Sequence, residues 1–356
     1  MTGSMQGGCK TVCAAAVLLI GTVAPGAADL AVAESSVVVL GAQTRAEHKQ
    51  FVASFKRFLV EQEQGVQFVD IALGDDIGNT DGLKDIIRQK KVPLILTVGP
   101  EAFQSALRQE ADPPLIAGLT HDAAELEKHP NATGVVLEYG VETQLAWIKR
   151  ILPDFKTIGV LYNPAASGQR VAAAKKAATK LGLKFVAQEV NSPSELPVAM
   201  ESLFRRVDVL WGLTDPVVLS RQTAKAILLT SFRNKVPFIA PSSAWVKAGA
   251  LYSLEVDYND IGVQTGEMAR SVLRGKQVSS IAPQQPREVR YSLNLRTAEH
   301  MRLKFSGDIV AGAAQVFEFP LDRTRHRMVT AQVALDWVRR TLLGEERVAL
   351  RYLRRP

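Results

Sequence analysis

Short apolar runs alternate with helical stretches along residues 155–220, and this alternation constrains the fold more than any other feature of the chain. The apolar run 158–162 leads into a polar loop at 163–168, and a helical pattern follows that ends near Gly182. Apolar runs at 184–190 and 207–213 then flank a second helical stretch. This order is typical of a parallel sheet with helices on its faces. We therefore predict an α/β fold.

Polar side chains follow two of these predicted strands. Asn163 and Ser167 come after the first strand, and Thr214 and Asp215 come after the third. In parallel α/β sheets, ligands bind outside the carboxyl ends of the strands. These short hydrogen-bonding side chains are therefore candidates for holding a small polar molecule.

The same alternation occurs in two successive arrays of similar length, without an internal sequence repeat. The first array has predicted strands at 36–40, 66–71, 94–98, 114–118 and 134–137. The second continues past residue 220 with predicted strands at 237–240, 251–256 and 289–295, and with helices at 297–303 and 309–317. Two arrays in a chain of 356 residues indicate two α/β domains.

The amino-terminal residues 1–33 resemble a secretory signal peptide. Lys10 precedes a short apolar segment, and small residues follow it. The apolar segment is too short to span a bilayer comfortably. Cleavage after Ala28 or after Ala33 fits the pattern, and we prefer Ala33. We therefore expect a periplasmic or extracellular protein.

Both cysteines of the chain, Cys9 and Cys13, lie inside this leader. Neither follows an apolar segment, as a lipid-anchored cysteine would. After cleavage the protein would contain no thiol, which excludes disulfides, cysteine nucleophiles and thiolate metal sites.

The positive charge is concentrated at the carboxyl end of the chain. Residues 319–356 carry +5 of the net charge of +7, so the main body is close to neutral and nucleic acid is not an expected partner. Within this basic extension, 331–343 has the pattern of an amphipathic helix that would touch acidic lipid or another protein. A poorly ordered extension is the alternative, because chain ends are often loose.

The motifs of common enzyme classes are missing from the sequence. It contains no dinucleotide-binding G-x-G-x-x-G after the first strand, no phosphate-binding loop, no H-E-x-x-H and no G-x-S-x-G. The five histidines are scattered, without metal-ligand spacing. We expect a binding protein rather than an enzyme, without a cofactor or a metal.

Several segments, in their order along the chain, carry a resemblance to a known family. They include TVGPEAF, GVVLEYGVETQLAWIKRILPDFKTIGVLYNPAASG, VDVLWGLTDPVVLS, VPFIAPSSAWVKAGALYSLEVDYNDIGVQTGEMARSVLRGK and YSLNLRTAEHM. Over residues 36–318 the chain is similar to ABC transporter substrate-binding proteins of the tryptophan/tyrosine type. The resemblance implies a type I periplasmic-binding-protein fold, in which two doubly wound parallel-sheet lobes are joined by a three-segment hinge and close over a ligand. The lobes would comprise 36–140 plus 258–290 and 141–257 plus 291–318, with crossovers near Gly140, Asp257 and Arg290.

The resemblance also implies a site built from strand-end loops of both lobes. The matching residues are Gly99, Pro100, Glu101, Asn163, Ser167, Gly168, Thr214, Asp215, Ser242, Ser243 and Asp257. Strand-end loops of the first array add Gln43, Thr44 and Thr120. Backbone N–H groups at helix starts favour a carboxylate, and Asp215 or Asp257 suits an ammonium group. We therefore expect a small zwitterion such as an amino acid, aromatic ones included. Pro216 stands where aromatic-amino-acid binders tend to have Asn, which leaves the ligand's side-chain class open.

Some of these residues also have a purely structural interpretation. Ser242, Ser243, Thr214 and Asp257 suit helix N-caps. Trp211 and Trp245 could stack on an aromatic ligand, but large aromatic side chains more often lie in the core.

Two functions remain open at this point. In the first, a monomeric protein closes over its ligand and delivers it to an ABC permease in the inner membrane. In the second, the same closure is sensed by a membrane receptor and nothing is transported.

Because the basic extension does not match the family, we predict that deleting residues 319–356 leaves ligand affinity unchanged. Calorimetric titration of the full and shortened proteins would test this. A tenfold loss of affinity would instead make the extension part of the binding unit.

Overall fold

The computed structural model describes residues 35–41, 45–73, 83–120 and 123–318. The predicted leader 1–33, the extension 319–356 with its predicted helix 331–343, and the candidate site residues Gln43 and Thr44 lie outside this part of the chain. None of the described helices is long and apolar enough to cross a membrane.

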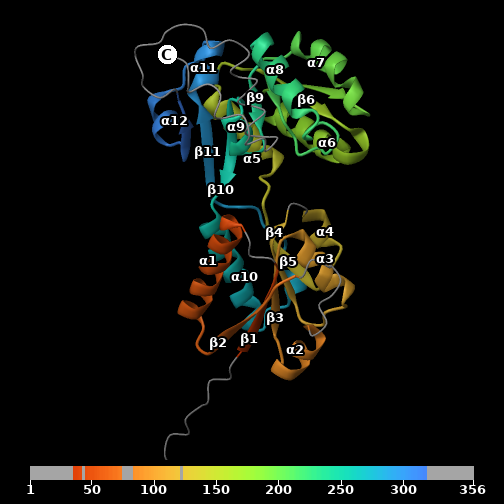
Figure 1. Cartoon of the computed structure of the whole chain (residues 1–356), viewed down its shortest axis with the longest axis vertical. Coiled ribbons are helices and arrows are strands. Elements are labelled where there is room, and N and C mark those ends of the chain that lie inside the picture. Colours follow the sequence, from red (N-terminus) through yellow and green to blue (C-terminus); the bar gives the residue numbers. More distant parts are fainter. Residues whose placement is uncertain (1–34, 42–44, 74–82, 121–122, 319–356) are drawn as a thin grey trace, which may run out of the picture. The chain divides into compact units, whose positions relative to one another are not determined.

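The first sheet consists of parallel strands. They are β1 (Ser35–Leu40), β2 (Val66–Ile71), β3 (Leu94–Val98), β4 (Leu115–Thr120) and β5 (Ala132–Val136). Their order in the sheet is β2-β1-β3-β4-β5 (Figure 1). Residues of β1 alternate between two core clusters, with Val37 and Val39 in one and Val38 and Leu40 in the other. Since both faces are buried at β1, the apolar residues of this strand are continuous rather than alternating with polar ones.

Helices cover both faces of this sheet. They are α1 (Ala46–Gln62), α2 (Leu83–Lys90), α3 (Pro100–Arg108), α4 (Ala123–Glu127) and α10 (Tyr258–Leu273). α1 and α10 share a core cluster with Val37 and Val39, whereas α2, α3 and α4 pack on the opposite face. α10 therefore belongs to the first sheet, although about 120 residues separate it from β5 in the sequence (Figure 1).

The second sheet is built from the later strands. They are β6 (Thr157–Tyr162), β7 (Lys184–Glu189), β8 (Val209–Trp211), β9 (Phe238–Ala240), β10 (Tyr252–Val256), β11 (Val289–Asn294) and β12 (Gln315–Phe317). Their order is β12-β11-β10-β9-β8-β6-β7. All neighbouring pairs are parallel except β10 and β11. The predicted α/β class with parallel sheets is confirmed, and this antiparallel pair was not predicted.

The antiparallel pair follows from the path of the chain. After β10 the chain leaves the second sheet, forms α10 on the first sheet, and continues through a short 3₁₀ helix, η2 (Val278–Ser280). Gln284 then forms an isolated parallel bridge with Val135 of β5. Because the chain re-enters the second sheet at the end where β10 left it, β11 runs in the opposite direction.

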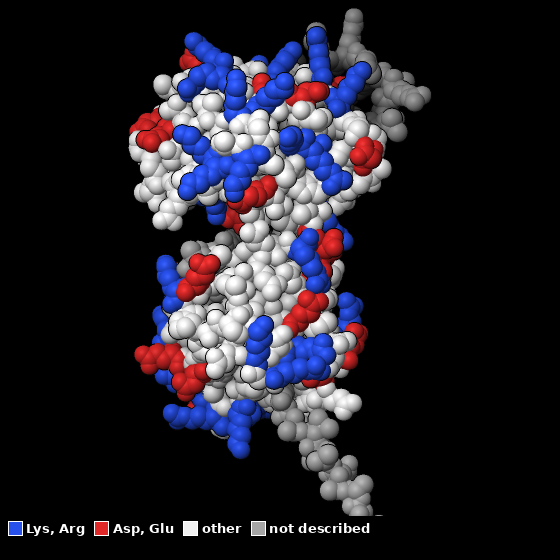
Figure 2. Space-filling view, turned by 180° about the vertical axis from the view of Figure 1, so that it is seen from behind, with Lys and Arg blue, Asp and Glu red and all other residues white. Residues whose placement is uncertain are grey.

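Helices also cover the two faces of the second sheet. They are α5 (Val141–Ile151), α6 (Pro164–Lys180), η1 (Pro193–Glu195), α7 (Leu196–Phe204), α8 (Ala224–Asn234), α9 (Ser243–Lys247), α11 (Leu295–Met301) and α12 (Gly307–Ala311). α5, α6, α11 and α12 contribute to one core cluster, and α7, α8 and α9 contribute to the other. Lysine and arginine side chains occur together with acidic ones on the surface of both α/β arrays (Figure 2).

Two local predictions are wrong. The polar loop expected at 163–168 is nearly absent, because α6 begins at Pro164. The side chain of Asn163 accepts a hydrogen bond from the N–H of Ala166 at 3.2 Å, and the proline occupies the first helical position, where its missing N–H costs nothing. The helix expected at 309–317 ends at Ala311, and 315–317 instead forms the edge strand β12.

The contact between α1 and α10 depends on two glycines of α10. A Cβ atom at Gly262 would lie 2.5 Å from the backbone oxygen of Phe51 and 2.8 Å from Cβ of Ser54. A Cβ atom at Gly266 would lie 2.6 Å from the ring of Phe58. The two helices therefore approach more closely than any side chain at these positions would permit.

We predict that Gly262→Ala lowers the free energy of unfolding by about 1–3 kcal/mol, because the new methyl group meets backbone atoms of α1 that cannot move aside. Urea unfolding followed by circular dichroism would measure the loss.

Gly168→Ala is the matched control, since a Cβ atom at this helical glycine would meet nothing within 4 Å. Its stability should be unchanged or higher by up to about 1 kcal/mol. Equal stabilities of the two variants would contradict the close packing of α1 on α10.

Candidate functional site

A cavity of about 300 Å³ lies at the carboxyl ends of β8 and β9, beside β10. Residues from the segment that follows β5 and from the start of α10 complete its lining. We refer to this cavity as the β8–β10 pocket. Its position agrees with the rule that ligands of parallel α/β sheets bind outside the carboxyl ends of the strands.

Aromatic side chains form much of the wall of the β8–β10 pocket. Trp211 is almost fully buried at the end of β8, and its indole N–H donates to Oε1 of Gln144 at 3.0 Å. The side-chain amide of Gln144 in turn donates to the backbone oxygen of Tyr139 at 2.7 Å. This chain of hydrogen bonds fixes the plane of the indole ring, so Trp211 is both a core residue and part of the pocket wall.

Tyr252, at the start of β10, also lines the pocket and is fully buried. Its hydroxyl group has no hydrogen-bond partner among the residues that the structure describes. Burial raises the pKa of this phenol well above its usual value, so the group is neutral and retains its proton for donation. A buried hydroxyl without a partner costs free energy, and proteins usually avoid it.

Glu255 brings a carboxyl group into the same pocket. The hydroxyl of Ser253 donates to its Oε1 atom, and both the backbone N–H and the hydroxyl of Ser243 donate to the carboxyl group, as does the hydroxyl of Ser292. Burial raises the pKa of the Glu255 carboxyl, and these hydrogen bonds only partly oppose the increase. No ion pair within the described part of the chain includes Glu255.

The hydroxyl of Tyr139 ties together the segments that connect the two sheets. It lies 2.8 Å from the backbone oxygen of Glu255 and 2.6 Å from that of Glu288. Burial, together with the nearby charge of Glu255, raises the pKa of Tyr139, which keeps the hydroxyl protonated and able to donate. The segment after β5 is thereby joined to the end of β10 and to the segment before β11.

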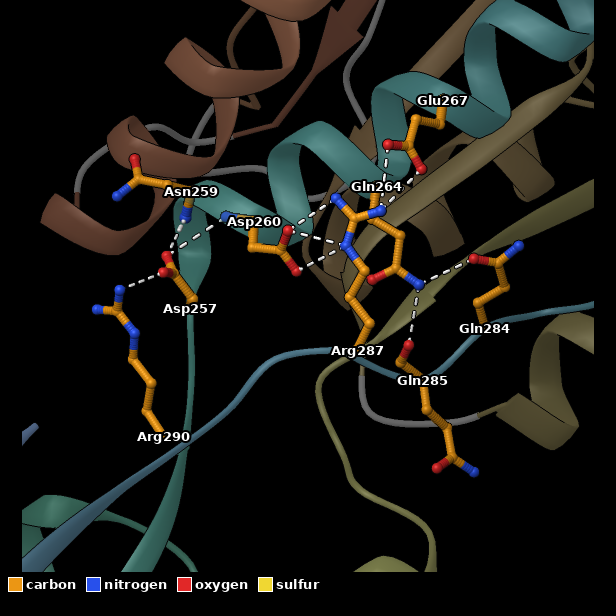
Figure 3. A network of polar contacts seen from close by, with 9 residues as sticks. All are labelled: Asp257, Asn259, Asp260, Gln264, Glu267, Gln284, Gln285, Arg287 and Arg290. Atoms are coloured by element: carbon orange, nitrogen blue, oxygen red, sulfur yellow. Dashed lines mark hydrogen bonds and ion pairs between the residues drawn. The ribbon is translucent and has the colours of Figure 1, made fainter. Parts of the chain in front are cut away.

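Polar contacts also surround the start of α10 (Figure 3). Asp257 caps this helix by accepting from the backbone N–H groups of Asn259 and Asp260, and its other oxygen lies 2.5 Å from Arg290. Arg287 forms ion pairs with Asp260 and Glu267 of α10. The helix-cap interpretation of Asp257 is therefore confirmed, and its charge is balanced by Arg290.

Some of the residues expected at the site do meet at the β8–β10 pocket. Thr214 and Ser242 line it directly. Ser243 contributes through its hydrogen bonds to Glu255. Ser242 occupies the N-cap position of α9 without forming a side-chain cap, so capping does not account for its hydroxyl group.

Asp215 and Asn163 have clear structural tasks. Asp215 is nearly fully buried and accepts hydrogen bonds from the backbone N–H groups of Asn163, Val217 and Val218, at 2.8, 2.9 and 3.1 Å. It thereby joins the end of β6 to the loop after β8. Asn163 caps α6, and Ser167 is buried in the first turns of that helix.

The remaining expected residues lie elsewhere. Gly168 is part of α6. Gly99, Pro100 and Glu101 form the start of α3, and Thr120 ends β4 in the first sheet. None of them is among the residues that line the β8–β10 pocket.

Several pocket residues were missed from the sequence. They are Glu138, Tyr139, Gln144, Tyr252, Glu255 and Tyr258. Glu255 could have been found from the sequence. A glutamate inside an otherwise apolar predicted strand is unusual and indicates a specific role for the carboxylate. Tyr252 is a buried aromatic residue of a strand, and its sequence pattern is that of an ordinary core residue. The others follow strands or lie in the first turn of a helix, where no local pattern separates pocket residues from ordinary surface ones. Within the described residues, no cluster of three or more histidine, cysteine or acidic side chains is placed to hold a metal ion.

The fold has two α/β arrays that are joined by three connecting segments, with a pocket at strand ends. This combination defines a ligand-binding protein of the periplasmic-binding type. The family model of ABC transporter substrate-binding proteins matches residues 77–317. The chain therefore belongs to this family, as its sequence indicated.

One relative and two solved structures illustrate the similarity. A tyrosine-binding protein from Clostridioides difficile is 28% identical over 216 residues, which are 58% of this chain and 62% of that protein. The ligand-free, open structure of a substrate-binding protein with adhesive properties from Clostridium difficile has a TM-score of 0.66 at 24% identity, covering 80% of this chain and 99% of the other. A domain from Streptococcus pneumonia in complex with L-Trp has a TM-score of 0.54 at 22% identity, covering 80% and 100%. The predicted type I fold is confirmed.

We predict that Asp215→Ala lowers the free energy of unfolding by about 3 kcal/mol, because three backbone N–H groups lose their acceptor. Thermal and chemical denaturation would measure the effect.

Asp215→Asn, which retains one acceptor oxygen, should lose less. Asp154→Ala serves as the control at an exposed position and should stay within about 0.5 kcal/mol of the unmodified protein. If Asp215→Ala were as stable as Asp154→Ala, the structural role of Asp215 would be refuted.

Proposed function

We propose that the protein is the exported solute-binding component of an ABC importer, and that it binds an amino acid, aromatic ones included, in the β8–β10 pocket. The array built on the first sheet closes over the bound ligand, and the closed protein delivers it to a permease in the inner membrane. The protein works outside the cytoplasm, as a monomer and without catalysis.

The pocket itself is the observation that carries this proposal. A volume of about 300 Å³ is at the small end of the range for ligand sites, so it suits a small molecule rather than a peptide. Aromatic walls provide apolar and stacking contacts, and a few polar groups would fix the orientation of the ligand. An amino acid with an apolar or aromatic side chain has this combination of properties.

The comparisons support the same ligand class. One relative is named for binding tyrosine, and one protein of the same fold was solved with L-Trp. The signal-like leader supports export, and membership of the family supports a permease partner.

The proposal predicts that free amino acids raise the melting temperature of the purified protein. A ligand at 100 times its dissociation constant stabilises the folded state by about 2.7 kcal/mol. The screen should include L-tyrosine, L-tryptophan, L-phenylalanine, aliphatic amino acids, sugars and purines. We expect a shift with one or more amino acids, followed by a calorimetric dissociation constant. Shifts only with sugars or purines would refute the ligand class.

Ser242→Trp tests the location of the site, because an indole ring at this position would fill the pocket. Amino-acid binding should be lost while the protein stays folded. Ser202→Trp, at an exposed position of α7, is the matched control and should bind normally. Normal binding by Ser242→Trp would place the site elsewhere.

A further inference from the structure

The carboxylates near the β8–β10 pocket differ in how their charges are balanced. Glu138 forms an ion pair with Arg170, and Asp257 forms one with Arg290. The carboxylate of Asp215 accepts hydrogen bonds from three backbone N–H groups. Glu255 is held by serine hydroxyls and one backbone N–H, all of them neutral donors. Within the described part of the chain, Glu255 is thus the pocket-lining carboxylate for which no cationic partner is found.

This arrangement costs stability while the pocket is empty. Withdrawing a carboxylate from water is unfavourable unless a positive charge is brought close to it, and hydrogen bonds from neutral groups compensate only in part. The raised pKa of Glu255 is the expected consequence of its burial. A cation that enters the pocket would supply the missing charge, and the ion pair would be stronger there than at the protein surface.

Tyr252 provides an independent observation in the same pocket. Its side chain is fully buried, and its hydroxyl has no partner within the described ranges of the chain. Both Tyr252 and Glu255 belong to β10, and both line the pocket. The lining of the pocket therefore includes a residue with a carboxylate and a residue whose buried hydroxyl has no partner among the described residues.

We propose that Glu255 receives the primary ammonium group of the ligand and that the hydroxyl of Tyr252 forms a hydrogen bond with the same ligand. This inference rests on the proposed amino-acid binding and makes it more specific. The recognised class is then primary amines with an apolar or aromatic body, and amine-free carboxylates and sugars are rejected. Asp215 and Asp257, the acidic residues that the sequence favoured for this role, serve the fold instead.

The test compares ligands that differ only in the amine. L-Tryptophan and L-tyrosine are titrated by calorimetry beside their amine-free analogues, indole-3-propionate and 3-(4-hydroxyphenyl)propionate. The unmodified protein should bind the amino acids at least tenfold more tightly than the analogues. Glu255→Gln should weaken the amino acids by about 10- to 100-fold, the usual effect of losing a charged hydrogen bond, and should change the analogues less than threefold.

Tyr252→Phe tests the second part. It should weaken amino-acid binding by roughly threefold to tenfold, and it should also raise the melting temperature of the ligand-free protein, since a buried hydroxyl without a partner is removed. A purely structural tyrosine would not give this combination.

If Glu255→Gln fails to fold, Glu255→Asp, which retains the charge on a shorter side chain, should keep the preference for amino acids over their analogues.

The possible failures can be told apart. If the unmodified protein binds neither these two nor any other amino acid of the screen, the proposed function fails and this inference fails with it. If it binds them but Glu255→Gln binds them equally well, the proposed function stands and the role of Glu255 is refuted. If Glu255→Gln weakens amino acids and analogues to the same extent, Glu255 supports the pocket without recognising the amine. Loss of amine preference in Glu255→Asp would also refute the assignment.

Discussion

The hydroxyl group of Tyr139 holds together the part of the molecule on which the rest depends. It lies within hydrogen-bonding distance of backbone oxygens at the end of β10 and before β11, and its own segment follows β5. All three connections between the two sheets therefore meet at one buried side chain. The backbone of Glu255 is one of the groups held there, so the same contact also fixes the strand that carries the pocket's carboxylate.

Each array adds its own constraint to this junction. In the first array, α10 lies against α1 so closely that only glycine fits at two positions, which attaches the segment after β10 to the first sheet. In the second array, Asp215 joins the end of β6 to the loop after β8. The first contact satisfies a packing requirement and the second satisfies backbone N–H groups. Asp215, which makes the second contact, is also a residue that the sequence favoured for ligand binding.

The pocket illustrates how stability and binding compete. Among the described residues, the carboxylate of Glu255 has no cationic partner and the hydroxyl of Tyr252 has no hydrogen-bond partner, although folded proteins usually satisfy such groups. Features of this kind reduce the stability of the empty protein and become favourable when a complementary ligand enters. They distinguish Glu255 from Asp215 and Asp257, whose charges are already used by the fold.

The sequence by itself determined the α/β class, the order of strands and helices, and the family, because continuous apolar runs and helical periodicity are local patterns. It also indicated that polar residues after β8 and β9 would lie at a site, and Thr214 and Ser242 do line the pocket. The resemblance also assigned 258–290, which contains α10, to the first lobe. Only the tertiary structure decided that β11 runs antiparallel to β10. It also decided that Glu255 is the pocket-lining carboxylate without a cationic partner in the described part of the chain. Aspartates that cap helices or bind backbone N–H groups have the same sequence signature as aspartates that bind ligands, and only their surroundings in space separate the two.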